Sequence, residues 1–302
     1  MTTSPLLSRG PFVTDGGLET DLIFHQGADL PEFAAFPLVE EEGGRALLRK
    51  YYDGYADVAR KAGRGLLLET PTWRANPDWA AKVGYDLAAL DRVNQHAVEF
   101  IGVQATTYSD LDTVLVGAMG PRGDGYVAGD TPTPEEAADY HAHQIRSLAA
   151  AGADLVSAMT ITSPQEAMGV VAAARSVSIP VATGFTVETD GRLPDGTPLR
   201  DAVEAVDAAG GPDWFLVNCA HPTHIAPAFD GGEWQARIAG IRPNASTMTH
   251  AELDEMEVLD EGDLPLLVSS LDALRGQLPS LAIVGGCCGT DARHVAALWG
   301  VG

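Results

Sequence analysis

Short apolar runs recur along the whole chain, and longer stretches rich in Ala and charged residues separate them. Strands that are apolar on both faces are typical of a parallel sheet covered by helices. Eight such units predict an α/β chain that folds as one (β/α)8 TIM barrel domain over residues 1–302, with an open doubly wound sheet as the alternative. The runs are Phe12-Val13, Leu66-Leu67-Leu68, Val114-Leu115-Val116, Leu155-Val156, Pro180-Val181-Ala182, Trp214-Phe215-Leu216-Val217, Ile238-Ala239-Gly240-Ile241 and Leu281-Ala282-Ile283-Val284.

Three of the intervening stretches carry helix start signals. Thr133-Pro134-Glu135-Glu136 places a capping hydroxyl, a first-turn proline and two acids before an Ala-rich run that extends to Ala151, and Gly152 follows as the stop. Ser163-Pro164 predicts a second helix to Arg175, and Thr197-Pro198 predicts a third that ends near Gly210-Gly211.

Charge excludes one large class of partners. The chain has 42 Asp and Glu against 19 Lys and Arg, a formal charge of −23, whereas a nucleic acid backbone selects clustered basic residues. No run reaches the roughly 18 apolar residues of a membrane span, and residues 1–10 lack the apolar segment of a signal peptide. We therefore expect a cytoplasmic protein that binds neither nucleic acid nor membranes.

In a barrel of this kind the chemistry lies where strands end and βα loops begin. The first run is followed by Asp15-Gly16-Gly17-Leu18-Glu19, in which the glycines would let backbone amides approach a ligand and the two acids could hold an ammonium group; a tight turn and a helix start would explain the motif equally. The second run is followed by Thr70, Trp73 and Arg74. Trp73 could form an apolar wall or attract a cationic methyl donor through its ring, or could be packing bulk.

All three cysteines of the chain fall at predicted strand ends: Cys219 after the sixth run, and Cys287 and Cys288 after the eighth. Three thiolates suit a soft tetrahedral ion and leave a fourth position open, as in catalytic zinc sites. Consecutive residues of a regular strand face opposite ways, so the vicinal pair could share a ligand only where the backbone leaves the pleat. Buried free thiols, or a structural zinc with His221 or His224 as fourth ligand, are the alternatives.

Other barrel chemistries have less support. Schiff-base aldolases need a lysine at a strand end, but Lys50, Lys61 and Lys82 all lie in helical stretches. His141-Ala142-His143 has the spacing of an amidohydrolase metal pair, but it falls in a predicted helix, where residues i and i+2 do not share a face. We expect these histidines on the helix surface.

Together these motifs resemble the homocysteine S-methyltransferase family. Its barrel binds zinc through a cysteine after strand six, here in Asn218-Cys219, and a vicinal pair after strand eight, here in Gly285-Gly286-Cys287-Cys288-Gly289-Thr290. Asp15-Gly16-Gly17, Phe185-Thr186 with Asp195-Gly196-Thr197-Pro198-Leu199, and Pro243-Asn244-Ala245 extend the resemblance over nearly the whole chain. It implies substrate-binding roles for Asp15, Gly16, Gly17, Glu19, Thr70, Trp73, Arg74, Met159 and Asn218.

The resemblance also implies a reaction. Zinc on Cys219, Cys287 and Cys288 would hold the thiol of homocysteine as a thiolate, which attacks an electrophilic methyl group to give methionine. Members that use folate carry further domains and members that use betaine carry a C-terminal extension. A chain that ends 14 residues after Cys288 therefore predicts the compact type, with a sulfonium donor, S-methylmethionine or S-adenosylmethionine. Homo-oligomerisation stays open.

Two positions depart from the family pattern. Met159 stands where the family has the glutamate that binds the amino group of homocysteine, and a thioether cannot balance an ammonium charge. Either Asp15 and Glu19 hold the amino group unaided, or the acceptor is a thiol without one. Arg74 replaces a neutral polar residue and could bind a donor carboxylate, or form a surface ion pair. A non-catalytic zinc-dependent thiol carrier and a subunit that needs a corrinoid partner are the remaining alternatives.

Overall fold

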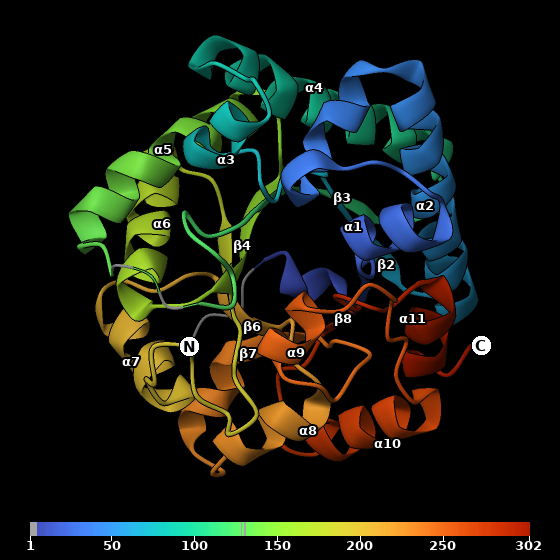
Figure 1. Ribbon diagram of the computed structural model, residues 1–302. Helices are drawn as coiled ribbons and strands as arrows, with labels where there is room; N and C mark the ends of the chain where they lie inside the picture. Colours follow the sequence, from blue (N-terminus) through green and yellow to red (C-terminus); the bar gives the residue numbers. More distant parts are fainter. Residues whose placement is uncertain (1–4, 128, 130) are drawn as a thin grey trace.

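Eight parallel strands pair in chain order and close into a barrel (Figure 1). The computed structural model describes residues 5–127, 129 and 131–302. Phe12 of the first strand pairs with Gly65 of the second and with Ile283 of the eighth, which closes the ring. The strands are β1 Phe12–Val13, β2 Gly65–Glu69, β3 Thr113–Met119, β4 Leu155–Ile161, β5 Val181–Phe185, β6 Trp214–Asn218, β7 Ile238–Arg242 and β8 Ile283–Val284. The predicted (β/α)8 barrel is therefore confirmed, and the open sheet is excluded.

The strands are buried on both faces, as their apolar runs predict. One apolar cluster takes a residue from every strand, including Leu67 of β2 and Trp214 of β6, and fills the inside of the barrel. The neighbouring Leu66 and Leu68 point outward and pack in a second cluster with the tyrosines of α2 (Glu42–Ala62). Because side chains alternate along a strand, a run such as Leu66 to Leu68 covers the barrel interior and the helix contact at once.

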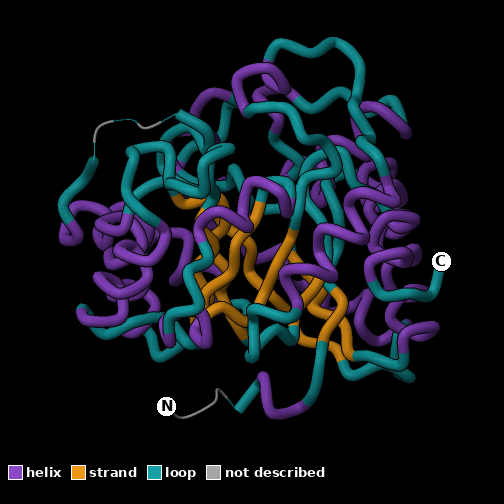
Figure 2. The backbone as a smooth tube through the Cα atoms, turned by 90° about the horizontal axis from the view of Figure 1, so that it is seen from below, coloured by secondary structure: helices purple, strands orange, loops and turns teal. Residues whose placement is uncertain are grey.

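Helices surround the strands, which lie at the centre in Figure 2. The predicted start at Thr133 is confirmed, because Thr133 and Glu136 form a capping box at the start of α5. The start at Ser163 is confirmed as well, whereas Pro198, and not Thr197, is the N-cap of α7. Besides α2, the α-helices are α1 Leu18–Thr20, α3 Pro77–Lys82, α4 Leu87–Thr107, α5 Pro134–Ala150, α6 Pro164–Ser176, α7 Leu199–Ala208, α8 Pro222–Ile225, α9 His250–Asp254, α10 Leu264–Arg275 and α11 Ala292–Leu298.

Short 3-10 segments and one π-helical turn complete the loops, at η1 Leu7–Arg9, η2 Asp21–His25, η3 Pro31–Phe33, η4 Phe36–Glu40, η5 Ala226–Ala228 and η6 Glu233–Arg237. No helix of the described residues combines the length and apolarity that a membrane crossing needs. The segments that follow the carboxyl ends of the strands meet at one mouth of the barrel, and that mouth holds the site described next.

Candidate active site and metal centre

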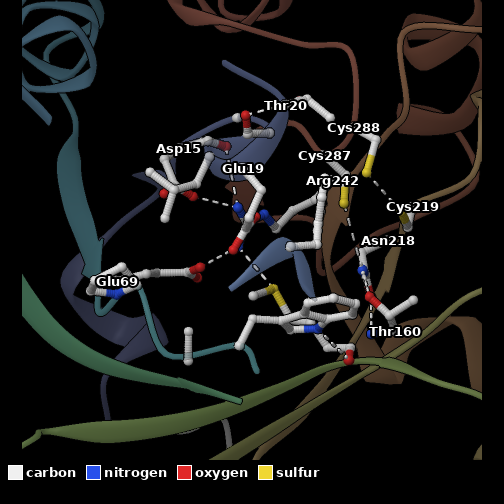
Figure 3. A pocket seen from close by; sticks show the side chains of 18 of the residues that line it. Asp15, Glu19, Thr20, Glu69, Thr160, Asn218, Cys219, Arg242, Cys287 and Cys288 are labelled. Atoms are coloured by element: carbon white, nitrogen blue, oxygen red, sulfur yellow. Dashed lines mark hydrogen bonds and ion pairs between the residues drawn. The ribbon is translucent and has the colours of Figure 1, made fainter. Parts of the chain in front are cut away.

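The three cysteines meet at the carboxyl end of the barrel (Figure 3). Their Sγ atoms all lie within 4.8 Å of one another, and the Sγ atoms of Cys219 and Cys288 are 3.6 Å apart. Cys219 is buried, Cys287 and Cys288 are partly buried, and none forms a disulfide. Residues separated by 68 positions in the chain thus form one cluster of thiols.

The backbone leaves regular strand geometry at each cysteine. Cys219 has a φ of 58°, a left-handed conformation that is rare for residues other than glycine. β8 ends at Val284, so Cys287 and Cys288 lie in a loop, and the alternation that would separate vicinal side chains does not apply. The loop is fixed to the segment after β7, where Cys287 N–H donates to the Pro243 carbonyl (2.8 Å) and the Cys288 carbonyl accepts from Ala245 N–H (3.1 Å).

Three side chains support the strained turn at Cys219. Its carbonyl accepts hydrogen bonds from Thr186 Oγ1 (3.3 Å), Asn244 Nδ2 (3.1 Å) and His250 Nε2 (2.7 Å). These donors follow β5, follow β7 and begin α9, so three loops hold one backbone group. A turn that costs on the order of 1–3 kcal/mol persists where its surroundings fix it in this way.

Tyr126, from the segment between β3 and α5, reaches the same cluster. Its Oη lies 3.0 Å from Cys219 Sγ and 3.3 Å from Cys288 Sγ, and its ring stacks on His250 at 4.5 Å between centroids. Burial, followed by the neighbouring sulfurs of Cys219 and Cys288, raises the pKa of Tyr126 well above its ordinary value. The phenol therefore stays neutral, with its hydroxyl within hydrogen-bond distance of two sulfurs.

The donor set fits a soft metal ion. Three sulfurs within 4.8 Å can occupy three corners of a zinc tetrahedron. Hydrogen bonds from Cys219 and Cys287 lower the pKa of Cys288 well below its ordinary value, whereas the hydrogen bond with Cys287 raises that of Cys219. The cluster thus favours a thiolate at Cys288, which is the protonation state that a metal requires.

The two loop histidines considered as a fourth ligand stand apart from this cluster. His221 Nδ1 lies 2.8 Å from Thr223 Oγ1 and caps α8, and burial lowers the pKa of His221 to about 4. In the part of the chain that the structure describes, neither His221 nor His224 joins the group of three sulfurs. The fourth corner is thus left to Tyr126 or to a ligand.

Next to the sulfurs lies an inner chamber with a buried ion cluster that the sequence analysis did not find. Arg242, the last residue of β7, pairs with the carboxylates of both Asp15 and Glu69 (Figure 3). The three side chains are only 4–7% exposed. Although burial lowers the pKa of Arg242, Glu69 and Asp15 raise it above its ordinary value.

The two acids of the first loop differ in their ion pairing, although burial acts on both of them. Burial raises the pKa of Asp15 to about 7, against the lowering influence of Arg242. Burial also raises the pKa of Glu19 to about 7, with smaller contributions from Cys287 and Asp15. Among the described residues no ion pair reaches the Glu19 carboxylate, which lines the chamber.

Gly16 and Gly17 also line the chamber. Besides the predicted approach of a ligand, close packing against a neighbouring loop explains why these two positions lack a side chain. A Cβ on Gly17 would lie 2.6 Å from the Cys287 carbonyl oxygen, and one on Gly16 would lie 2.8 Å from that of Thr290. The glycines let the loop after β1 pack against the loop that carries the cysteine pair.

The other predicted residues of the inner chamber hold its walls together. Thr70 Oγ1 accepts from Ala118 N–H (2.9 Å). Asn218 donates to Thr160 Oγ1 (2.9 Å) and accepts from Thr160 N–H (2.9 Å). Met159 Sδ lies 2.9 Å from Arg242 Nη1, and the Met159 carbonyl accepts from Trp73 Nε1 (3.3 Å).

Arg74 lies outside the inner chamber, in the wall of a second, outer chamber. Its guanidinium stacks over the Trp79 ring at 3.8 Å, lies 5.2 Å from the Trp73 ring, and donates to the Glu32 carbonyl. These contacts replace the surface ion pair that was one alternative for Arg74. The two chambers meet at five residues: Thr20, Phe33, Trp73, Tyr126 and Cys288.

The histidine pair of α5 is helical as predicted, but His141 is not on the helix surface. It is buried, and its Nε2 lies 2.9 Å from Glu166 Oε1. The pair lies among helices α5 and α6, away from the sulfurs.

Comparisons with known proteins agree with the fold and with the family that the sequence resembles. Residues 12–300 match the family model described as homocysteine S-methyltransferase. The chain is 25% identical over 311 residues to Homocysteine S-methyltransferase 4 from Zea mays, covering 96% of this chain and 88% of that protein. The metallated form of the homocysteine methyltransferase MmuM from Escherichia coli has a TM-score of 0.74 at 23% identity and covers 99% of both chains. Its oxidized form has the same TM-score at 22% identity, covering 99% of this chain and 98% of the other.

Proposed function

The chain belongs to the homocysteine S-methyltransferase family, and from that premise we propose that it moves a methyl group from a sulfonium donor to the sulfur of homocysteine in a zinc-dependent reaction. The donor is S-methylmethionine or S-adenosylmethionine. The C–S bond to the methyl group breaks in the donor, which leaves as a neutral thioether. A new C–S bond forms at the acceptor sulfur, whose thiol proton is released, and the product is methionine.

Cys219, Cys287 and Cys288 are the residues that would hold the metal. When bound, zinc supplies a site at which a thiol is deprotonated at neutral pH. The chain itself contributes the positions of the three sulfurs, through the left-handed turn at Cys219 and the loop after β8. Tyr126 contributes a neutral hydroxyl directed at two of these sulfurs.

The inner chamber suits a small acceptor. Its cavity volume, counted as the space that the centre of a water molecule can reach, is about 60 Å³. This space holds only a few waters. A space of this size favours an amino acid thiol over a peptide thiol. Glu19 lines this space and forms no ion pair among the described residues, so it is the group that we assign to the acceptor's ammonium.

The outer chamber suits the donor, because it meets the inner one at Cys288 and Tyr126. The outer chamber is larger, with a cavity volume of about 330 Å³ by the same measure. Trp73 borders both chambers, where its ring can attract the positive charge of a sulfonium. Arg74, further out, is placed to meet the carboxylate of a donor that is itself an amino acid.

The observation that carries this proposal is the cluster of three free thiols beside a chamber of amino acid size. The test is metal content together with methyl transfer from S-methylmethionine to homocysteine, for the natural protein and Cys288→Ala. We expect about one zinc per chain in the natural protein and loss of turnover in the variant.

Two other results would contradict the proposal in different ways. Zinc binding without turnover with either sulfonium would identify a thiol carrier. Turnover that begins only when a methylated corrinoid protein is added would identify a subunit of a larger system.

A further inference from the structure

Arg242 changes which ligands Asp15 and Glu69 can bind in the inner chamber. All five of its N–H groups have acceptors inside the protein. Nε donates to the Gly286 carbonyl (3.1 Å), Nη1 to Glu69 and to Met159 Sδ, and Nη2 to the Asp15 carboxylate and carbonyl. Arg242 is therefore a fixed part of the chamber wall and has no donor left for a substrate carboxylate.

The same contacts give both acids a permanent cation. Two buried carboxylates without a counter-ion would bind an ammonium ligand strongly, because the ligand would neutralise charges that are costly to bury. Here the guanidinium already neutralises one of the two charges and hydrogen-bonds to both carboxylates. Met159, the third member of this wall, adds no charge.

We infer that Arg242 is a specificity-determining residue that stands in for the acceptor's ammonium group, so loss of the amino group from the acceptor weakens its binding and turnover by less than about 100-fold. This inference rests on the proposed function, because it concerns the acceptor of that reaction. Rejection of an analogue is strong, about 10⁴–10⁵-fold, where its missing group leaves buried partners unpaired. Asp15 and Glu69 stay paired whichever acceptor binds, and Glu19 alone distinguishes the two.

The test compares homocysteine with its des-amino analogue, 4-mercaptobutanoate, which keeps the carboxylate and the chain length. Binding of each thiol to the zinc-loaded protein is measured by calorimetry, and kcat/KM is measured for methyl transfer to each. We expect homocysteine to be preferred by less than about 100-fold in both. A preference above that value overturns the inference. Calorimetry still decides the ratio if no donor supports turnover, so failure of the proposed function stays distinguishable. If neither thiol binds, the inference and the proposed function are both wrong.

Variants of Arg242 separate charge from shape. Arg242→Gln removes the internal cation and should raise the preference for homocysteine at least 10-fold, whereas Arg242→Lys keeps a cation and should leave the preference low. Equal preferences in these two variants would contradict the inference.

A second pair of variants covers the case in which Arg242→Gln does not fold. Met159→Glu adds a carboxylate beside Arg242 and should raise the preference for homocysteine, whereas Met159→Gln, of the same size, should not. A merely structural role for Arg242 predicts lower stability in each case but an unchanged ratio between the two thiols.

Discussion

The two sides of the inner chamber are built in opposite ways. On the sulfur side, three thiols from the loops after β6 and β8 lie together, and among the described residues their side-chain partners are one another, Tyr126 and the amide of Asn218. On the charge side, Arg242 satisfies Asp15 and Glu69 within the protein. Under the proposed function the sulfur side acts by taking up an ion, whereas the two acids of the charge side already have a cationic partner within the protein. Recognition by this chamber should accordingly depend more on the acceptor's sulfur than on its amino group.

Metal removal should have the largest effect on activity, and it should act on the sulfur side and not on the charge side. Treatment with a strong chelator should abolish methyl transfer, and Zn²⁺ but not Mg²⁺ should restore it, because thiolates bind the softer ion. Circular dichroism of the metal-free protein should be close to that of the loaded protein, since the barrel does not depend on the cysteines. Unfolding on metal removal would show that the sulfur side is structural.

Removal of the internal cation should give the next largest effect. Arg242→Met should lower the free energy of unfolding by about 3–5 kcal/mol, because it leaves two buried carboxylates uncompensated. Urea denaturation at pH 8 measures this change. Arg200→Met is the control, since Arg200 pairs with Glu204 and Asp230 at the surface and should cost no more than about 1 kcal/mol. Equal losses in the two variants would contradict a buried ion cluster.

Glu19 should make stability depend on pH. Its pKa in the folded protein, about 7, lies above the ordinary value of 4.5, so the native state binds a proton more tightly than the unfolded state does. The stability from this group is present below pH 4.5 and is lost as the pH rises to 7. Glu19→Gln should therefore be more stable than the natural protein at pH 8, by no more than about 3 kcal/mol.

Urea denaturation between pH 4.5 and 8 tests this difference. The two proteins should have similar stability at the acid end of the range, and the surface variant Glu204→Gln should follow the natural protein throughout. A parallel pH dependence in Glu19→Gln would assign the effect to other groups.

Tyr126 should give the smallest effect. Tyr126→Phe removes one hydroxyl donor from the sulfurs, worth about 1 kcal/mol, so the metal should be retained and kcat/KM should change by less than about 10-fold. Tyr140→Phe, whose hydroxyl donates to Asn76, is the matched control. Loss of zinc in the Tyr126 variant would instead make the phenol an essential ligand.

The sulfur side could be predicted from the sequence, whereas the charge side could not. Cysteine is rare in this chain, so the placement of all three at strand ends was a strong signal. Arg242 also ends a strand, but its pairing with Asp15 and Glu69 depends on how the ends of β7 and β2 and the loop after β1 meet across the barrel mouth. Tyr126 gave no signal, because its loop has no regular pattern.

The same reasoning applies to single residues, of which His141 was predicted wrongly. The helix pattern around His141 indicated a helix but not which face is buried, and Glu166 of the next helix decides that burial. Gly16 and Gly17 signal a close approach, but the sequence does not say that the approaching group is the loop of Cys287 and Cys288.

By itself the sequence determined the barrel, because apolar runs that repeat with helix signals have few ways to bury both faces of each strand. It also indicated the three cysteines as the candidate centre of the chemistry, through their type and their positions at strand ends. Only the tertiary structure decided which charges are compensated and which stay open to a ligand. The pairing of Arg242 with two acids, and the absence of an ion pair at Glu19 within the part of the chain that the structure describes, depend on distances across the barrel mouth. Packing of the whole ring sets these distances.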